Sequence, residues 1–135
     1  MTVTAEMLDA HPGDLGAAER RALAECIDRC LDCVQACTAC ADACLAEDRV
    51  TELRRCVRTD LDCADICDAT ARVLSRHTGY GADVTRDVLA ACAAACAACA
   101  AECEGHAGTH EHCAVCAEAC RRCERACRDL LTALG

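Results

Sequence analysis

Cysteine recurs at alternating steps of four and three residues in the stretch CIDRCLDCVQACTACADAC, which covers residues 26–44. In an α-helix, residues that are three and four apart lie on the same face. The cysteines of this stretch therefore form one stripe, with the a/d spacing of a helix seam in which sulfur replaces the usual leucine. This spacing predicts a long helix that buries a row of thiols.

Three further segments repeat the stripe: CVRTDLDCADIC, CAAACAACAAEC and CAVCAEACRRCERAC. Four such helices can bury their cysteines together only if they surround a common axis. The interior would then be lined with sulfur, and every cysteine of the chain would contribute to it. The eighteen cysteines are Cys26, Cys30, Cys33, Cys37, Cys40, Cys44, Cys56, Cys63, Cys67, Cys92, Cys96, Cys99, Cys103, Cys113, Cys116, Cys120, Cys123 and Cys127.

Short breaks between these segments predict an all-α fold, an antiparallel up-down-up-down four-helix bundle with a cysteine-lined core. A short extra N-terminal helix is expected at Thr4–Ala10, ended by the sequence His11-Pro12-Gly13. We expect residues 1–16 to be an N-terminal segment and residues 17–135 to be the bundle, a single domain. The predicted bundle helices cover about residues 17–47, 51–77, 82–104 and 110–134, with Gly105 as the C′ residue of the third and Thr109 as the N-cap of the fourth.

The composition leaves the core without its usual large side chains. There is no Trp or Phe and a single Tyr among 135 residues, although 54% of the residues are hydrophobic. Alanine and cysteine supply much of that fraction, so the thiols must either fill the core themselves or hold something that does.

Charge and sequence context limit the partners and the compartment. The formal net charge of −9 argues against nucleic acid and against an anionic membrane surface. The N-terminus has no basic n-region or apolar h-region, and no segment is expected to reach transmembrane length. We therefore predict a cytoplasmic protein in which the thiols stay reduced. All basic residues are arginine, which together with the abundant alanine indicates a GC-rich bacterial genome.

The two ends of the predicted bundle differ. One end is hydrocarbon, and Met7 and Leu8 are expected to pack there, while His11 and His77 lie nearby and are not expected to be ligands. The opposite end is predicted to be an open mouth. The hydrocarbon end carries Leu23, Leu74, Leu89, Leu130, Leu131 and Leu134. The mouth carries Cys44, Cys56, Cys103 and Cys113, beside a loop with His106, His110, Glu111 and His112.

The thiol stripes indicate soft-metal binding. Thiolates select Cu(I), zinc or iron–sulfur clusters, and one monovalent ion per thiol leaves a buried interior neutral. Zinc needs four ligands per ion, which a layer such as Cys37, Cys63, Cys99 and Cys120 would supply. A zinc or general soft-metal buffer therefore stays open as an alternative to Cu(I) storage. A thiol-redox protein fits less well, because its C-x-x-C pair is expected at a helix start after a strand, whereas these pairs lie within helices. A metal-free thiol core also fits less well, because alanine or leucine would fill a core without the risk of oxidation.

The four cysteine segments and the histidine-bearing loop resemble the four-helix-bundle copper storage protein family, in its cytosolic branch. The resemblance implies a non-enzymatic protein that binds many Cu(I) ions inside the bundle and forms homotetramers. It makes all eighteen cysteines candidate ligands and places His106, His110 and His112 in the region of the copper entrance. The expected partners are copper ions, with a copper chaperone as candidate donor or acceptor, and neither nucleic acid nor membrane.

Two details of the site remain open at the level of sequence. The histidines of the loop are either Cu(I) ligands, because neutral imidazole binds Cu(I), or ordinary surface residues. Asp60 interrupts the second stripe and is expected to form hydrogen bonds or line the entrance, because a hard carboxylate suits Cu(I) poorly.

The third bundle helix is apolar on its outer face as well, in AACAAACAACAAEC, which predicts self-association.

Overall fold

The computed structural model describes residues 2–15 and 17–135, except for the side chains of Ala17 and Ala18. Met1 and Gly16, which begin and end the predicted N-terminal segment, lie outside the described residues. Within the described ranges the chain is helical and has no strand. The elements are α1 (Val3–Ala10), α2 (Ala17–Ala46), the 3-10 turn η1 (Val50–Leu53), α3 (Arg54–Leu74), α4 (Ala82–Glu104) and α5 (Glu111–Leu134).

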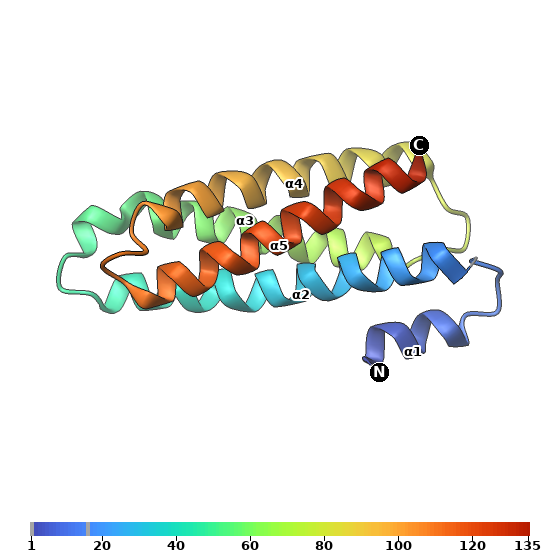
Figure 1. The fold of residues 1–135 in the computed structure, drawn as a ribbon, viewed down its shortest axis with the longest axis horizontal. Coiled ribbons are helices and arrows are strands. Elements are labelled where there is room, and N and C mark those ends of the chain that lie inside the picture. The colour runs from blue at the N-terminus through green and yellow to red at the C-terminus, as the bar shows by residue number, and fades with distance from the viewer. Residues whose placement is uncertain (1, 16) are drawn as a thin grey trace.

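Helices α2 to α5 lie along the long axis of the molecule and reverse direction at each connection (Figure 1). Helix α2 packs against α3 and α5, and α4 packs against α3 and α5, so the four helices surround one axis. The predicted fold class, an antiparallel four-helix bundle with a short N-terminal helix, is confirmed.

The second bundle helix differs from its predicted range. Residues 50–53 form a 3-10 turn that buries Leu53, and the α-helix begins only at Arg54. Its end at Leu74 comes three residues before the predicted one, and the N–H of Ser75 donates to the carbonyl of Ala71 there. The tighter 3-10 turn brings Leu53 into the core while the chain changes direction.

Both predicted cap residues between α4 and α5 are wrong. Gly105 is the C-cap of α4 and keeps a right-handed conformation, with φ −65° and ψ −20°, so it is not a left-handed C′ residue. The N-cap of α5 is His110, in extended conformation, and it makes no side-chain cap hydrogen bond. The N–H groups of Thr109 and His110 both donate to the carbonyl of His106, which forms a compact turn in place of the expected threonine cap.

Helix α1 lies outside the bundle, against α2 (Figure 1). Thr2 is its N-cap: its Oγ1 accepts from the N–H of Ala5 at 3.2 Å and lies 3.0 Å from Asp28 Oδ2 of α2. Leu8 is buried in the core, whereas Met7 is 66% exposed. Only one of the two residues predicted to pack together is therefore buried, because consecutive residues of a helix point in different directions.

Helix α4 is the one described helix that is long and apolar enough, by length and composition, to cross a membrane, with a mean hydropathy of 1.5. This result contradicts the expectation that no segment reaches transmembrane length. Alanine and cysteine raise the hydropathy of α4, and its cysteines are all buried inside the bundle.

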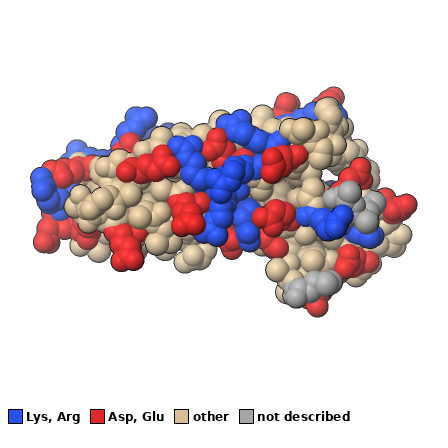
Figure 2. Space-filling model, in the orientation of Figure 1, with Lys and Arg blue, Asp and Glu red and all other residues tan. Residues whose placement is uncertain are grey.

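The outer faces carry charges of both signs. Figure 2 shows arginine and acidic side chains interspersed across one face of the bundle, with basic atoms gathered near its middle. Arg121 contacts Glu104 at 2.8 Å and Glu124 at 2.9 Å, and Arg128 contacts Glu124 at 2.9 Å. Surface ion pairs generally contribute little stability each, so folding depends mainly on the interior.

Candidate metal centre

All eighteen cysteines lie on the inner faces of the bundle as free thiols, and none is more than 1% exposed. Steps of three and four residues keep each stripe on the inner face over the full length of its helix. The four stripes meet along the axis, as the sequence predicts.

Sulfur contacts continue along the column from helix to helix. Neighbouring Sγ atoms are 3.5–4.0 Å apart, and the closest pair is Cys37 and Cys120. Cys26 begins the column in contact with Cys127 at 3.7 Å, and Cys103 lies 3.6 Å from Cys56 near its other end. No helix could form these contacts alone, because most of them join cysteines of different helices.

The thiols form groups of four in which all Sγ atoms lie within 4.8 Å of one another. Three of the groups overlap in succession: Cys33 and Cys63 belong to two of them, and so do Cys37 and Cys120. An ion held in one group would therefore share sulfur ligands with its neighbour. Five of the groups are Cys30–Cys92–Cys123–Cys127, Cys33–Cys63–Cys67–Cys96, Cys33–Cys37–Cys63–Cys120, Cys37–Cys99–Cys116–Cys120 and Cys40–Cys44–Cys56–Cys113.

The predicted zinc layer of Cys37, Cys63, Cys99 and Cys120 is divided between two of these groups. Cys63 lies with Cys37 and Cys120 in one group, and Cys99 lies with the same pair in the next. Where groups overlap, one sulfur can bind an ion in each of two groups. This arrangement favours bridging sulfur ligands and disfavours separate layers of four ligands each.

Burial keeps two thiols of the mouth, Cys44 and Cys113, protonated. It raises the pKa of the Cys44 and Cys113 thiols, because the charged thiolate is disfavoured away from water. A metal cation that binds to Cys44 and Cys113 must therefore displace their protons, so binding there releases protons.

Asp60 is fully buried beside the column, and thiols surround its carboxyl group. Its Oδ1 accepts from Cys99 at 3.1 Å, Cys116 at 3.3 Å and Cys103 at 3.5 Å, and its Oδ2 lies 3.8 Å from Cys56. Burial, with the neighbouring Cys116 and Cys99 sulfurs, raises the pKa of Asp60 to about 12. The carboxyl group is therefore protonated at neutral pH, and the hydrogen-bonding role predicted from sequence agrees with these contacts.

The three histidines of the mouth are not equivalent. His112 Nδ1 lies 3.4 Å from Cys40 Sγ and 3.6 Å from Cys113 Sγ, at the top of the column. His106 Nε2 instead lies 3.3 Å from Glu102 Oε1, and His110 Nδ1 contacts Glu47. The structure brings one of the three predicted imidazoles to the thiols and places the other two against carboxylates.

Glu47 and Glu102 are the residues of the mouth that sequence reasoning missed. Each is one of 23 acidic residues in the chain, and neither stands in a recognisable motif. Only the folded bundle brings the end of α2 and the end of α4 next to the histidine loop.

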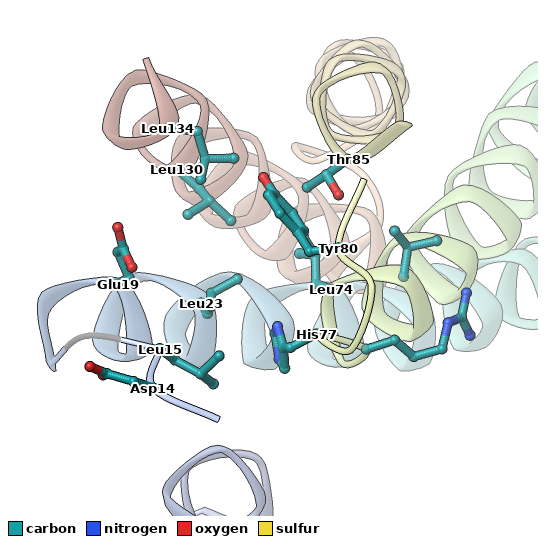
Figure 3. A pocket seen from close by; sticks show the side chains of 12 residues that line it. Asp14, Leu15, Glu19, Leu23, Leu74, His77, Tyr80, Thr85, Leu130 and Leu134 are labelled. Atoms are coloured by element: carbon teal, nitrogen blue, oxygen red, sulfur yellow. The ribbon is translucent and has the colours of Figure 1, made fainter. Parts of the chain in front are cut away.

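The opposite end of the column is closed by leucine. Leu74, Leu89 and Leu130 are at most 2% exposed. Outside them lies an open hollow of about 290 Å³, toward which Leu23, Leu134 and Tyr80 point (Figure 3). His77 also lines it, and its ring meets that of His11 of the N-terminal segment at 5.5 Å, edge to face.

A column of buried thiols with one closed end is the arrangement expected of a protein that holds soft metal ions. The family described as copper storage protein matches residues 19–132. The chain belongs to the copper storage protein family. The family resemblance predicted from the cysteine segments is confirmed.

Solved structures of copper storage proteins are similar over most of the chain. Ccsp from Streptomyces lividans, loaded with 10 copper equivalents, is 63% identical, with a TM-score of 0.94, over 96% of this chain and 98% of that one. A cytosolic copper storage protein from Streptomyces lividans with five coppers is 67% identical, with a TM-score of 0.88, over 89% and 100%. The Cu(I)-bound BsCsp3 of Bacillus subtilis is 38% identical, with a TM-score of 0.70, over 78% and 93%. No curated protein matches the chain significantly.

Proposed function

We propose that this chain is a cytosolic Cu(I) storage protein, which holds many ions through cysteine thiolates inside the bundle and keeps them from harmful reactions. The observation that carries this proposal is the continuous column of buried Sγ atoms spaced 3.5–4.0 Å apart. Soft thiolates select Cu(I), which also accepts two or three ligands and so suits sulfurs that bridge successive ions. A storage role requires no catalytic residue.

The proposed ligands are the eighteen cysteines, with His112 as an additional ligand at the mouth. Each Cu(I) that replaces a thiol proton leaves the charge of the interior unchanged. A divalent ion on two thiols is also balanced in charge, but tetrahedral zinc needs four ligands around each ion, whereas Cu(I) accepts two or three, so the same thiols can hold more Cu(I) than zinc. The relatives loaded with five and ten coppers support a capacity of many ions.

Metal titration of the fully reduced protein tests the proposal. We expect tight binding of about one Cu(I) per cysteine, measured against a chromophoric Cu(I) chelator. Saturation by zinc at about four or five ions, with an affinity that resists competing Cu(I), would favour the soft-metal buffer. Disulfide reductase activity without tight metal binding would favour the thiol-redox alternative.

We also propose that the chain forms homotetramers through the outer face of α4. Ala94, Ala95 and Ala98 of α4 line a shallow groove with Ile66 of α3, and small side chains of this kind allow close helix packing. Light scattering at micromolar concentration should give the mass of four chains. Replacement of Ala94 and Ala98 by Glu should lower that mass, and a monomeric parent would contradict the proposal.

The proposed partners are otherwise copper ions and a copper chaperone as donor or acceptor. We propose residues 17–135 as the single storage domain and residues 1–16 as an appended segment. Copper loading by a chain that starts at residue 17 should equal that of the full chain.

A further inference from the structure

Glu47 stands directly after α2, at the mouth of the bundle, in a position that disfavours a carboxylate. Its N–H donates to the carbonyl of Cys44 at 3.3 Å, in the last turn of the helix. The C-terminal end of a helix carries a partial negative charge, which repels an acidic side chain. The end of this 30-residue helix therefore gives no electrostatic reason for a glutamate at position 47.

The contacts of the Glu47 side chain are with the histidines of the mouth. Glu47 Oε2 contacts His110 Nδ1 and lies 3.8 Å from His112 Nε2. The two imidazole rings are stacked, with centroids 5.4 Å apart and planes inclined by 23°. In the described part of the chain, Glu47 has no other ion-pair partner, whereas Glu102 beside His106 also pairs with Arg55.

The two ring nitrogens of His112 face different surroundings. Nδ1 faces the Cys40 and Cys113 sulfurs at 3.4 and 3.6 Å. Nε2 is shielded from solvent and has no hydrogen-bond partner among the described residues, and Glu47 Oε2 is a carboxylate oxygen beside it. A neutral imidazole carries one N–H, so His112 can offer the Nδ1 lone pair to a metal ion only if the proton is on Nε2. A carboxylate beside Nε2 favours that tautomer.

We infer that Glu47 is a positioning residue for copper uptake, which holds the two stacked imidazoles and directs the Nδ1 lone pair of His112 toward the first thiols of the column. This inference rests on the proposed function, because it assigns a role in loading the same column. A small turn of the His112 ring closes the 3.8 Å separation into an Nε2–H···Oε2 hydrogen bond when Nδ1 binds an ion. The carboxylate also supplies a negative charge where the incoming Cu(I) is still unpaired with a thiolate.

The variant Glu47→Gln tests the role, because it keeps the size of the side chain and removes its charge. The matched control is Asp48→Asn, which removes the same charge from the exposed neighbouring residue and touches neither histidine. Two quantities are measured for each variant: the stopped-flow rate of Cu(I) transfer from a chelator, and the tautomer of His112 from its ¹⁵N ring chemical shifts. The number of Cu(I) ions bound at saturation is measured for both variants and the parent.

We expect Glu47→Gln to slow uptake about tenfold and to lower the fraction of the Nε2–H tautomer of His112. Asp48→Asn should match the parent in both quantities. Parent-like uptake by Glu47→Gln overturns the inference, and so does slow uptake with an unchanged tautomer, because Glu47 would then act only as a local charge. Capacity separates the two proposals: a parent that fails to bind about one Cu(I) per cysteine refutes storage, whatever the Glu47 variants do.

Discussion

The mouth and the leucine end of the bundle are built on the same helix spacing with different chemistry. At the mouth, the inward positions hold Cys44 and Cys113, His112 lies beside them, and carboxylates lie against the histidines. At the other end, the inward positions hold Leu74 and Leu130. The comparison shows that periodicity determines which residues face inward, while the side chains at those positions determine whether an ion can pass.

Stability should depend most on the leucine end. Leu130→Ala should lower the free energy of unfolding by about 2–5 kcal/mol, because a fully buried leucine leaves a cavity. Chemical denaturation of the reduced protein measures the loss. The matched control, Leu131→Ala, lies at a partly buried position and should cost less. Copper capacity should stay the same in both variants. A large fall in capacity for Leu130→Ala would show that the leucine end also affects metal binding.

Asp60 should make the stability of the metal-free protein depend on pH. Its pKa is raised by burial to about 12, above the ordinary aspartate value of about 4. For an acid with a raised folded pKa, the contribution to stability is complete below the unfolded pKa and is lost as pH rises toward the folded value. Asp60→Asn should therefore raise the free energy of unfolding at pH 7, by at most about 4 kcal/mol.

Denaturation of the reduced, metal-free protein at pH 5 and pH 8 checks this expectation. The advantage of Asp60→Asn over the parent should be larger at the higher pH. Asp62→Asn is the control, because Asp62 is exposed on the same helix and pairs with Arg58 at 3.0 Å. A constant difference between Asp60→Asn and the parent would show that the buried carboxyl group does not titrate as expected.

The rate of copper uptake should depend on the mouth and not on the leucine end. Replacement of His106, His110 and His112 by Ala should slow transfer from a Cu(I) chelator, with capacity nearly unchanged. His112→Ala alone should lower the transfer rate about tenfold and account for most of the effect, because His112 is the imidazole that contacts thiols. The control is His77→Ala, at the far end. Equal uptake rates for the triple variant and the parent would refute the prediction that copper enters at the mouth.

The smallest expected effect concerns the docking of α1 near the leucine end. Burial and the nearby His11 lower the pKa of His77, so the folded state favours its neutral form. For a histidine with a lowered folded pKa, the stabilising contribution is complete above the unfolded value of about 6.5 and is lost as pH falls. Hydrogen exchange of α1 amides should therefore quicken, relative to the intrinsic rates, between pH 7.5 and 5.5. His77→Gln should remove that change, and a parent without it would show that the contact between the two rings does not hold α1.

Much of the fold was predictable because its signals are local. The 3/4 spacing placed the bundle helices, and the ranges of α2 and α4 agree with prediction to within one residue. The errors fall at the connections: Thr109 is not a cap, and residues 50–53 form a 3-10 turn. These details depend on how the chain reaches the next helix, which no periodic pattern describes.

The sequence by itself determined that the cysteines share one interior and that a soft ion suits them. In a helix, the spacing of residues along the chain determines which face of the helix they lie on. Only the tertiary structure decided which sulfurs meet, that Asp60 accepts from Cys99 and Cys116, and that His112 rather than His106 reaches the thiols. The physical reason is that contacts between helices depend on their rotation and their stagger along the axis. Packing of all the side chains sets both quantities together, and spacing within one helix contains neither.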